Sequence, residues 1–519
     1  MAEAATKLPF HHPEHPAVFR DPTDAMTVDV DVAVIGSGAG GATIAAELAE
    51  AGLEVAIFEK GPYVTHVDMT QTERDMIPLL FEDAGSRTTR DGGMLVWHAH
   101  AVGGTTVVNN AICFDPPDEI LDRWASEFGV EGARKADLAP SIAKARFVLN
   151  VQRIQPHEIS KNAQVMMRGA EKLGLKGGLF EHNRTACLQS GFCMLGCAYD
   201  RKQNHNITYV PRALSFGAKL YPDARIGRMA PSGRAIKHAV GTIKNRKTGQ
   251  LHALEIRARI FVVAGGAIST PTLLLANGLA NGSGQVGLNL HCHPTAPVVA
   301  WFKDEEIYFN RGITQVFYVD KLDEGYLLES ISGGPSQSGA MVPVYGKALH
   351  EVMKGFNHFA AAFVQIRDEV SGRVSVGPKT VPIVDYTIRE PDASKLRKGY
   401  ETLCRIYLTG GASHVEIPHN NLKRYRNEAD LAEIAKLGLA PGTFGALTAH
   451  QMGTCRMGED PRKAVVDSGG KAHDYDNLFI ADSSVFPTSI GVNPQITITT
   501  LATHFARRIV REKSKLIGS

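Results

Sequence analysis

The sequence contains no apolar run long enough to span a bilayer, and residues 1–27 lack the apolar core of a signal peptide. Charge is balanced, because the 56 Lys and Arg residues exceed the 54 Asp and Glu residues by only two. No strong field therefore favours nucleic acid or an anionic membrane as a partner. Seven cysteines in 519 residues are too few for a disulfide scaffold and favour a reducing compartment. We expect a cytoplasmic protein whose residues 1–27 form an N-terminal arm.

A chain of 519 residues is too long for one hydrophobic core, so two or more domains are expected. Residues 295–390 differ from the rest, because β-rich runs there are joined by Gly, Asp and Pro turns. These runs are 298–302, 314–319, 359–366 and 383–388. The pattern predicts an antiparallel sheet that forms a second domain.

Residues 28–53 have the pattern of a strand, a glycine turn and a helix. Gly36 allows the tight turn, Gly38 lets the backbone approach a pyrophosphate, and Gly41 lets the helix pack close to the strand. The helix N-terminus offers free N–H groups to phosphates. A second apolar run ends at Glu59, which is the right distance downstream to hold a ribose hydroxyl. The pattern predicts a dinucleotide site without deciding between NAD and FAD.

Residues 102–110 form a second glycine turn in which Gly103 and Gly104 precede small hydroxyl residues. Such a turn lets a planar or phosphorylated ligand approach the backbone closely. An ordinary turn between core segments is the alternative.

Residues 187–197 hold three of the cysteines, Cys187, Cys193 and Cys197. They are possible ligands of an iron–sulfur cluster or zinc. The paired spacing of a structural zinc site and a fourth nearby cysteine are both missing, which favours a structural loop.

Other segments have recognisable periodicity. We expect strands over 218–229 and 256–264 and an irregular stretch within 65–101. One helix should start at Thr270 and Pro271. Another should follow a cap at Asp392 or Ser394. The expected helices are 118–128, 135–149, 395–408 and 496–511.

Two features near the C-terminal end of the chain point to proton chemistry. His450 opens the run His-Gln-Met-Gly-Thr-Cys, and an imidazole can take a hydroxyl proton near neutral pH. Asn493 and Pro494 lie in Gly-Val-Asn-Pro-Gln, where the proline and the following helix start would hold the amide rigidly. Taken singly, each has a common structural explanation.

Together the motifs resemble the glucose–methanol–choline (GMC) oxidoreductases, from about residue 28 to 512. The glycine turn with Glu59 resembles that family's ADP-binding unit for FAD. Residues 102–110 resemble its first signature, with Asn109 at the asparagine position, and residues 266–275 resemble its second.

Residues 287–294 resemble the family's Gly-x-Asn-Leu-x-x-His element. This likeness argues against His291 and His293 as a metal pair, and we expect no metal site.

The resemblance implies an α/β fold, with a Rossmann-like FAD-binding domain and a substrate domain built on an antiparallel sheet flanked by helices. The implied FAD-binding domain comprises 28–154, 207–296 and 444–516, and the substrate domain comprises 155–206 and 297–443. His450 falls on the catalytic histidine and Asn493 on its partner. Some relatives anchor the flavin covalently through a histidine where this chain has Val108, so FAD should be bound noncovalently. The implied cofactor-binding residues are Gly36, Gly38, Gly41, Glu59, Gly103, Gly104, Thr105, Asn109, Ile226, Ala264, Asp482, Pro494, Gln495 and Thr497.

The implied reaction is FAD-dependent oxidation of an alcohol to an aldehyde or ketone, with His450 as the general base and hydride transfer to flavin N5. Three local features resemble the long-chain alcohol oxidase branch, which favours a hydrophobic alcohol, long-chain, aryl or sterol-like. They are the cysteine loop of 187–197, the Asn-Leu-His-Cys-His-Pro run of 289–294, and residues 116–124. Plant members of that branch are associated with membranes, so a peripheral location stays open.

The electron acceptor is left open between oxygen and a quinone or redox partner. The alternative function is an FAD sugar or polyol dehydrogenase with an iron–sulfur cluster at Cys187, Cys193 and Cys197. An NAD-dependent enzyme would explain residues 28–59 and leave the C-terminal motifs without a role. A noncatalytic flavoprotein and a light-driven decarboxylase are further alternatives.

Overall fold

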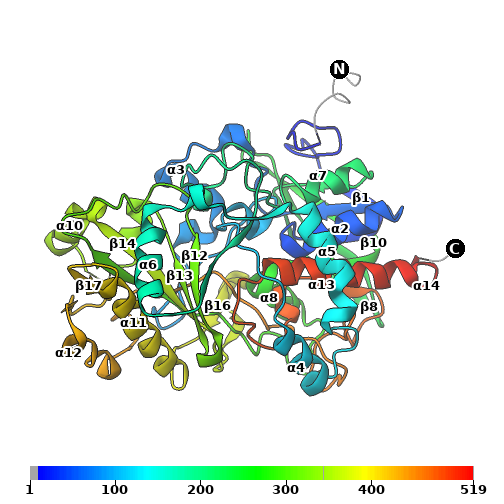
Figure 1. Ribbon diagram of the computed structural model, residues 1–519. Helices are drawn as coiled ribbons and strands as arrows, with labels where there is room; N and C mark the ends of the chain where they lie inside the picture. The colour runs from blue at the N-terminus through cyan, green and yellow to red at the C-terminus, as the bar shows by residue number, and fades with distance from the viewer. Residues whose placement is uncertain (1–9, 343, 518–519) are drawn as a thin grey trace.

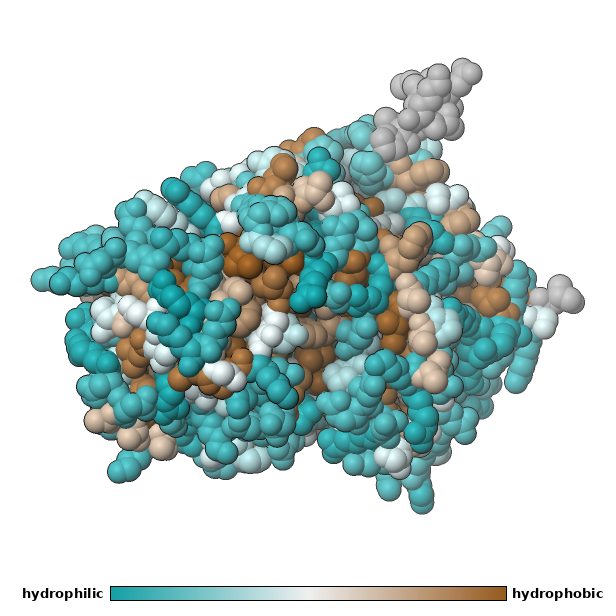
Figure 2. Space-filling view, in the orientation of Figure 1, coloured by the Kyte–Doolittle hydropathy of each residue, from teal (hydrophilic) through white to brown (hydrophobic). Residues whose placement is uncertain are grey.

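The computed structural model describes residues 10–342 and 344–517, so residues 1–9 of the expected N-terminal arm lie outside the described part. Helices surround two large sheets, with α2, α5 and α13 on one side of the molecule and α6 and α11 on the other (Figure 1). On the face seen in Figure 2 the surface is mostly hydrophilic, with apolar side chains gathered toward the middle. The predicted α/β architecture with a second, antiparallel sheet is confirmed.

The first sheet has a parallel centre and an antiparallel edge. Strands β7, β2, β1, β10 and β20 run parallel, and β9 and β8 extend the sheet from the first half of β10. Helices cover the parallel strands, which are therefore buried on both faces. The strands are β1 (Met26–Ile35), β2 (Val55–Phe58), β7 (Lys219–Tyr221), β8 (Ala224–Ser232), β9 (Ala235–Lys244), β10 (Leu251–Val263) and β20 (Leu478–Ile480).

Helix α2 (Ala39–Glu50) follows β1 and packs against α7 (Tyr209–Ser215) and α13 (Gln495–Arg511). The carboxyl ends of β1, β10 and β20 meet at one edge of the sheet. Their following loops therefore lie together, as ligand-binding loops do in open parallel sheets.

The second sheet is antiparallel except where β19 pairs with β3. Its order is β18-β17-β11-β14-β13-β12-β5, and β19 joins β11 beside the first sheet's loops. Helices α6 (Lys161–Lys172) and α11 (Asp392–Thr409) pack on it. The strands are β3 (Leu95–Val96), β5 (Gly177–Leu179), β11 (Thr295–Trp301), β12 (Phe317–Lys321), β13 (Tyr326–Ser330), β14 (Phe359–Ile366), β17 (His414–Glu416), β18 (Arg424–Tyr425) and β19 (Leu447–Thr448). The domain limits themselves stay a prediction.

Two predicted helix starts were wrong. Helix α8 (Gly266–Asn277) begins before Thr270, with Pro271 inside it. The proline lacks an N–H for the carbonyl of Ala267, and the hydroxyl of Thr454 donates to that carbonyl instead, at 2.8 Å. Helix α11 begins at Asp392, which is not a cap.

Three other predictions need correction. Residues 383–388 do not join the large sheet, because β16 (Pro382–Asp385) pairs with β15 (Arg373–Val376) in a separate hairpin. The expected strand over 218–229 is split into β7 and β8. The stretch 65–101 contains helix α3 (Glu73–Leu80).

The expected helices near 118–128, 135–149 and 496–511 are confirmed as α4 (Asp118–Phe128), α5 (Lys135–Val148) and α13. Within the described ranges, no helix combines the length and apolar character that crossing a membrane requires.

Candidate active site

The loops that follow β1 and β3 form a glycine-lined cradle. Gly36 has φ +105°, and a Cβ there would lie 2.3 Å from the carbonyl oxygen of Ala264. Gly104 has φ +56°, and its Cβ would lie 2.7 Å from the Cα of Gly38. The two predicted glycine turns therefore touch, and a Cβ on Gly104 would close the space between them. The bare backbone is left accessible to a ligand.

Two further glycines let helix α2 pack closely. A Cβ at Gly41 would lie 2.0 Å from the carbonyl oxygen of Gly36, in keeping with the predicted close packing of helix and strand. The contact at Gly40 is tighter, because its Cβ would lie 1.6 Å from the carbonyl oxygen of Ala481, just beyond β20. We predicted no role for Gly40, since nothing local in the sequence places β20 beside this turn.

Glu59 is buried at the edge of the cradle, where its carboxylate joins the two glycine turns. Its Oε2 accepts hydrogen bonds from the backbone N–H and hydroxyl of Ser37, at 3.0 and 2.7 Å. Its Oε1 accepts from the backbone N–H of Gly61 at 2.9 Å. The Ser37 hydroxyl also accepts from the N–H of Gly103 at 3.1 Å. A carboxylate has about four acceptor positions, so Glu59 can still accept from a ribose hydroxyl.

Asp482 joins the end of β20 to the start of α8. Its Oδ2 accepts from the N–H of Gly266 at 2.8 Å and from the hydroxyl of Thr270 at 2.6 Å. Its Oδ1 accepts from the N–H of Ser484 at 2.8 Å. Burial raises the pKa of this carboxyl. The bonds from its neighbours hold the cavity wall in place.

Asn109 of the second glycine turn meets the start of α13. Its Nδ2 donates to Oε1 of Gln495, and its Oδ1 accepts from the N–H of Ala111 at 3.1 Å. The Nε2 of Gln495 is buried and has no protein partner. A buried amide nitrogen at a cavity wall is a donor available to a ligand.

His450 and Asn493 lie side by side, as predicted from two distant motifs. The Nε2 of His450 is 3.4 Å from Nδ2 of Asn493, and its Nδ1 is 3.4 Å from Nδ1 of His293. The Oδ1 of Asn493 has no protein partner. Both side chains line the cavity, so both can contact one substrate oxygen there.

The protonation of these histidines follows from their surroundings. Burial, followed by the neighbouring His293, lowers the pKa of His450 to about 3. Burial lowers the pKa of His293 to about 4, so both rings are neutral near pH 7. The Nε2 of His293 accepts from the N–H of Gly491 at 2.9 Å. Its proton is therefore on Nδ1, facing His450.

Asp368 is a buried carboxylate that holds the loop carrying His293. Its oxygens accept from the N–H groups of Cys292 and His293 at 2.8 and 3.2 Å, and from the hydroxyls of Tyr386 and Ser489 at 3.0 and 2.7 Å. Its pKa is held well below the usual range, because the favourable interactions with His291, His293 and Ser489 outweigh the cost of burial. We did not predict this residue, since an isolated aspartate carries no sequence signal.

One cavity of about 470 Å³ joins the glycine cradle to the second sheet. It is lined by His450, Asn493 and most of the predicted cofactor residues: Gly36, Gly38, Glu59, Gly104, Thr105, Asn109, Ile226, Ala264, Asp482, Pro494 and Gln495. Gly41, Gly103 and Thr497 do not line it. Gly41 and Gly103 support the turns from behind, and Thr497 is buried inside α13.

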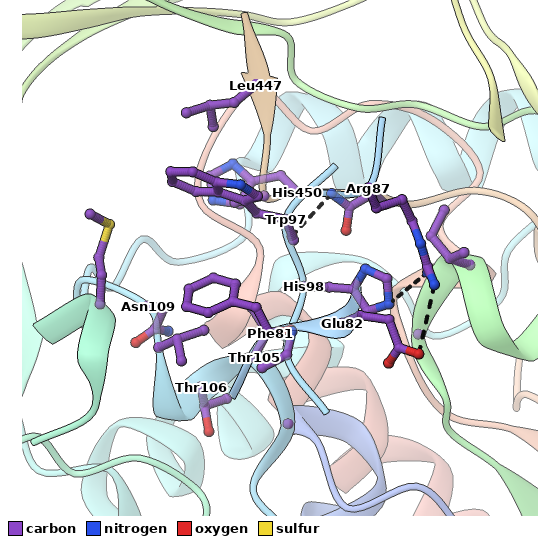
Figure 3. Close-up of a pocket in the computed structure, with 18 of the residues that line it drawn as sticks. Phe81, Glu82, Arg87, Trp97, His98, Thr105, Thr106, Asn109, Leu447 and His450 are labelled. Carbon is purple, nitrogen blue, oxygen red and sulfur yellow. Dashed lines mark hydrogen bonds and ion pairs between the residues drawn. The ribbon is translucent and has the colours of Figure 1, made fainter. Parts of the chain in front are cut away.

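A charged cluster absent from the predictions lines the same cavity. Arg87 points toward His98 and Glu82, lying 3.2 Å from Nε2 of His98 and 3.7 Å from Glu82 (Figure 3). Lys60 pairs with Glu82 at 2.8 Å. The pKa of Glu82 falls to about 2, because Lys60 and the nearby histidines outweigh the cost of burial. Lys60 and His98 come from segments other than the one that carries Glu82 and Arg87, so no single motif unites the cluster.

The cysteine loop of 187–197 is held by a buried lysine. The Nζ of Lys202 donates to the carbonyls of Val107, Asn109 and Cys193, each at 2.7 Å. The loop therefore braces the second glycine turn. In the part of the chain that the structure describes, no three His, Cys, Asp or Glu side chains converge as ligands of a metal ion.

The cavity fits FAD by its own chemistry. Gly38 and Gly104 form a backbone cradle, and a Cβ on Gly104 would lie 2.7 Å from the Cα of Gly38 and fill it. The N-terminus of α2 beside them suits a pyrophosphate. At the other end, unpartnered polar atoms of Asn493 and Gln495 are available to a bound ring. The residues that would hold the cofactor are thus those of the cradle, Glu59 and the segment 493–495.

Comparison with known proteins agrees with this fit. Residues 77–295 and 369–502 match the GMC oxidoreductase family, and residues 31–71 match an FAD binding domain. The Arabidopsis thaliana long-chain-alcohol oxidase FAO3 is 28% identical over 95% of this chain and 70% of its own. The long-chain-alcohol oxidase FAO4B of the same plant is 30% identical over 95% of this chain and 69% of its own.

Formate oxidase of Aspergillus oryzae has the same fold, with a TM-score of 0.70 at 16% identity, over 95% of this chain and 100% of its own. The matches to family models, the similar sequences and the shape of the cavity all indicate the same family. The chain belongs to the GMC oxidoreductase family and is an FAD-dependent oxidoreductase.

Proposed function

We propose that the protein oxidises a hydrophobic alcohol to an aldehyde or ketone, with His450 as the general base. The observation that carries the proposal is the position of His450 and Asn493 side by side on one wall of the cavity. FAD, held noncovalently, would accept the hydride from the alcohol carbon. The long-chain-alcohol oxidases among the relatives support this class of substrate.

His450 takes the hydroxyl proton. Its low pKa keeps the imidazole neutral, which is the form that a base requires. Asn493 orients the alcohol oxygen. Its Nδ2, the donor that lies 3.4 Å from Nε2 of His450, can stabilise the negative charge that develops on that oxygen, an effect of a few kcal/mol in comparable sites. Loss of Asn493 should therefore slow the reaction less than loss of His450.

Proton transfer to Nε2 of His450 requires the tautomer whose proton is on Nδ1. The Nδ1–H of His293 faces Nδ1 of His450 and favours the other tautomer, whereas the Nδ2 amide group of Asn493 faces Nε2 and favours this one. Both separations are 3.4 Å, which is longer than an ordinary hydrogen bond. Neither contact therefore fixes the tautomer, and a bound alcohol can select the one with a lone pair on Nε2.

The walls beyond His450 suit an apolar chain. Strands β11 and β14 present Pro297, Val299, Ala361 and Phe363 to the cavity, and Phe309 and Phe359 extend this surface. These side chains bury an alkyl or aryl group without an unpaired polar atom. A polyol would lose hydrogen bonds to water along this wall.

The test is anaerobic reduction of the bound flavin by a panel of fatty alcohols, aryl alcohols, sterols and sugars. We expect rapid bleaching of flavin absorbance with the hydrophobic alcohols and little with sugars. Fast reduction by sugars alone would contradict the proposal. Readmitting air then distinguishes an oxidase, which reoxidises at once, from a dehydrogenase that needs a quinone or protein acceptor.

We propose a cytoplasmic location. All seven cysteines are unpaired, which fits a reducing compartment. The iron–sulfur dehydrogenase remains the alternative function. Iron and sulfide analysis of the purified protein tests it, and stoichiometric iron would favour it.

A further inference from the structure

The far wall of the cavity carries a buried carboxyl with an unused oxygen. Glu329 on β13 is 2% exposed and lines the cavity. Its Oε2 accepts from Nε2 of Gln315 at 3.0 Å, whereas its Oε1 has no protein partner. Burial raises the pKa of this carboxyl to about 7. A buried acceptor without a partner is costly unless a ligand completes it.

The other carboxylates that line the cavity differ from Glu329. Glu59 and Asp482 each accept several hydrogen bonds, Glu82 pairs with Lys60, and Glu416 accepts from Nε1 of Trp301 and from Arg424. Within residues 10–342 and 344–517, Glu329 makes no ion pair. Its free oxygen is therefore a feature of this position and not of the cavity in general.

The register of β13 and β14 places Glu329 relative to Asn493, where the alcohol would react. Glu329 pairs with Phe363, and Gln365 stands two residues further along the same strand. The Nε2 of Gln365 donates to the carbonyl of Gly491, two residues before Asn493. Diagonal neighbours in adjacent strands are about 7–8 Å apart. Because Gln365 contacts the segment that carries Asn493, we expect a molecule that reaches from Asn493 to Glu329 to span a distance of this order, several carbon–carbon bonds.

We propose that the substrate is an alcohol with a second hydroxyl group at its far end, and that Glu329 accepts a hydrogen bond from that hydroxyl. This inference rests on the proposed function and specifies its substrate as a hydrophobic diol. The first hydroxyl lies between His450 and Asn493, and the carbon chain crosses the apolar wall around Phe363. Glu329 is then a specificity-determining residue.

A neutral hydroxyl suits this pocket better than an ammonium group. The partner of Glu329 is the neutral Gln315, and the walls nearby include Phe359 and Ile331. The hydroxyl of Ser332, which also lines the cavity, has no protein partner either. A substrate hydroxyl can donate to Glu329 and accept from Ser332, whereas an ammonium group can only donate.

The experiment compares linear α,ω-diols with 1-alkanols of equal length, four to ten carbons, in anaerobic flavin reduction by the holoenzyme. We expect kcat/KM for the best diol to exceed that of its alkanol at least about tenfold. Glu329→Leu should abolish this ratio. In Glu329→Gln the remaining oxygen accepts from Gln315, so the free position becomes an NH₂ group that can donate to the substrate hydroxyl, and the ratio should fall less than in Glu329→Leu. Glu416→Gln is the matched control, since its carboxylate is already paired, and it should leave the ratio unchanged.

Equal rates for diols and alkanols in the wild type would overturn the inference. So would equal changes of the ratio in Glu329→Leu and Glu416→Gln. If ω-amino alcohols outperform diols and Glu329→Gln removes that advantage, the distal group is a cation and the hydroxyl assignment is wrong.

A binding readout separates this inference from the proposed function. Calorimetry in the His450→Ala holoenzyme should show tighter binding of diols than alkanols, and adding Glu329→Leu should remove the difference. If diols bind with this dependence but no alcohol reduces the wild-type flavin, the proposed function fails and the inference stands. If alkanols and diols reduce the flavin equally and bind equally, the inference fails alone.

Discussion

Asp368 offers a test of how the buried network supports His293 and, through it, the proposed base His450. The change Asp368→Asn replaces one acceptor oxygen with an NH₂ group, although every partner of this side chain is a donor. If the amide oxygen stays toward Cys292 and Tyr386, the NH₂ faces the N–H of His293 and the hydroxyl of Ser489. The hydroxyl can turn to accept, but the N–H cannot.

The magnitude follows from the bonds lost. Hydrogen bonds to a charged group contribute about 1.5–3 kcal/mol each, and two are lost or weakened. We expect the free energy of unfolding to fall by about 3–5 kcal/mol, which is also the usual cost of breaking a buried charged network. Displacement of His293 should also slow flavin reduction, since a misplacement of about 1 Å can cost about 100-fold.

The effect should depend on pH with a definite sign. The pKa of Asp368 is lowered in the folded protein, so its stabilisation is present above the unfolded pKa, near 3.9, and is lost as pH falls through the folded value. The difference in unfolding free energy between wild type and Asp368→Asn should therefore be largest near neutral pH and shrink in acid.

Denaturant unfolding and anaerobic stopped-flow reduction measure the two effects. Asp392→Asn is the control, because Asp392 is also buried and accepts from two backbone N–H groups and from Lys395, at the start of α11. It should lose comparable stability and keep the reduction rate. Equal slowing in both variants would refute the special link between Asp368 and the pair His293 and His450.

Three further predictions concern the cradle, its brace and the tautomer. Gly104→Ala should weaken FAD binding more than about tenfold in a flavin titration, because its Cβ would meet Gly38. Gly52→Ala is the control and should keep normal affinity, since Gly52 also has a positive φ, +79°, but open space around it. Lys202→Met removes the donor from three backbone carbonyls, so this variant should release FAD on mild heating. Lys172→Met, on the surface, should not. Equal flavin loss in the two variants would contradict the role of Lys202 in holding the second glycine turn. Nitrogen NMR of labelled histidine, assigned with His450→Gln, should show the His450 proton on Nδ1 when an alcohol analogue is bound; a proton on Nε2 in that complex would contradict base action at Nε2.

Local patterns predicted the parts of the fold and site that depend on local chemistry. The strand, turn and helix of residues 28–53 follow from valine alternation and three glycines, and they appear as predicted. The pairing of His450 with Asn493 was also predicted, through a family resemblance rather than a rule of spacing. The start of α8 was missed, because the hydroxyl of Thr454 compensates for Pro271 from a distant segment.

Long-range packing accounts for what the sequence could not provide. The constraint on Gly40 comes from Ala481, and Lys60 reaches the charged cluster from a different segment than Glu82 and Arg87. Glu329 lies in a strand whose sequence, Tyr-Leu-Leu-Glu-Ser, shows nothing about its unpaired oxygen. Such features depend on which neighbours supply partners, and one sequence does not reveal that.

The most direct test of the central claim is the rate of anaerobic flavin reduction by a hydrophobic alcohol in His450→Ala. The variant should bind FAD normally, since the glycine cradle is untouched, and the reduction should slow by about 10²–10⁴-fold, the range for loss of a general base. Asn493→Ala should slow it less. A reduction rate in His450→Ala within a few-fold of wild type would contradict the role of His450 as the base.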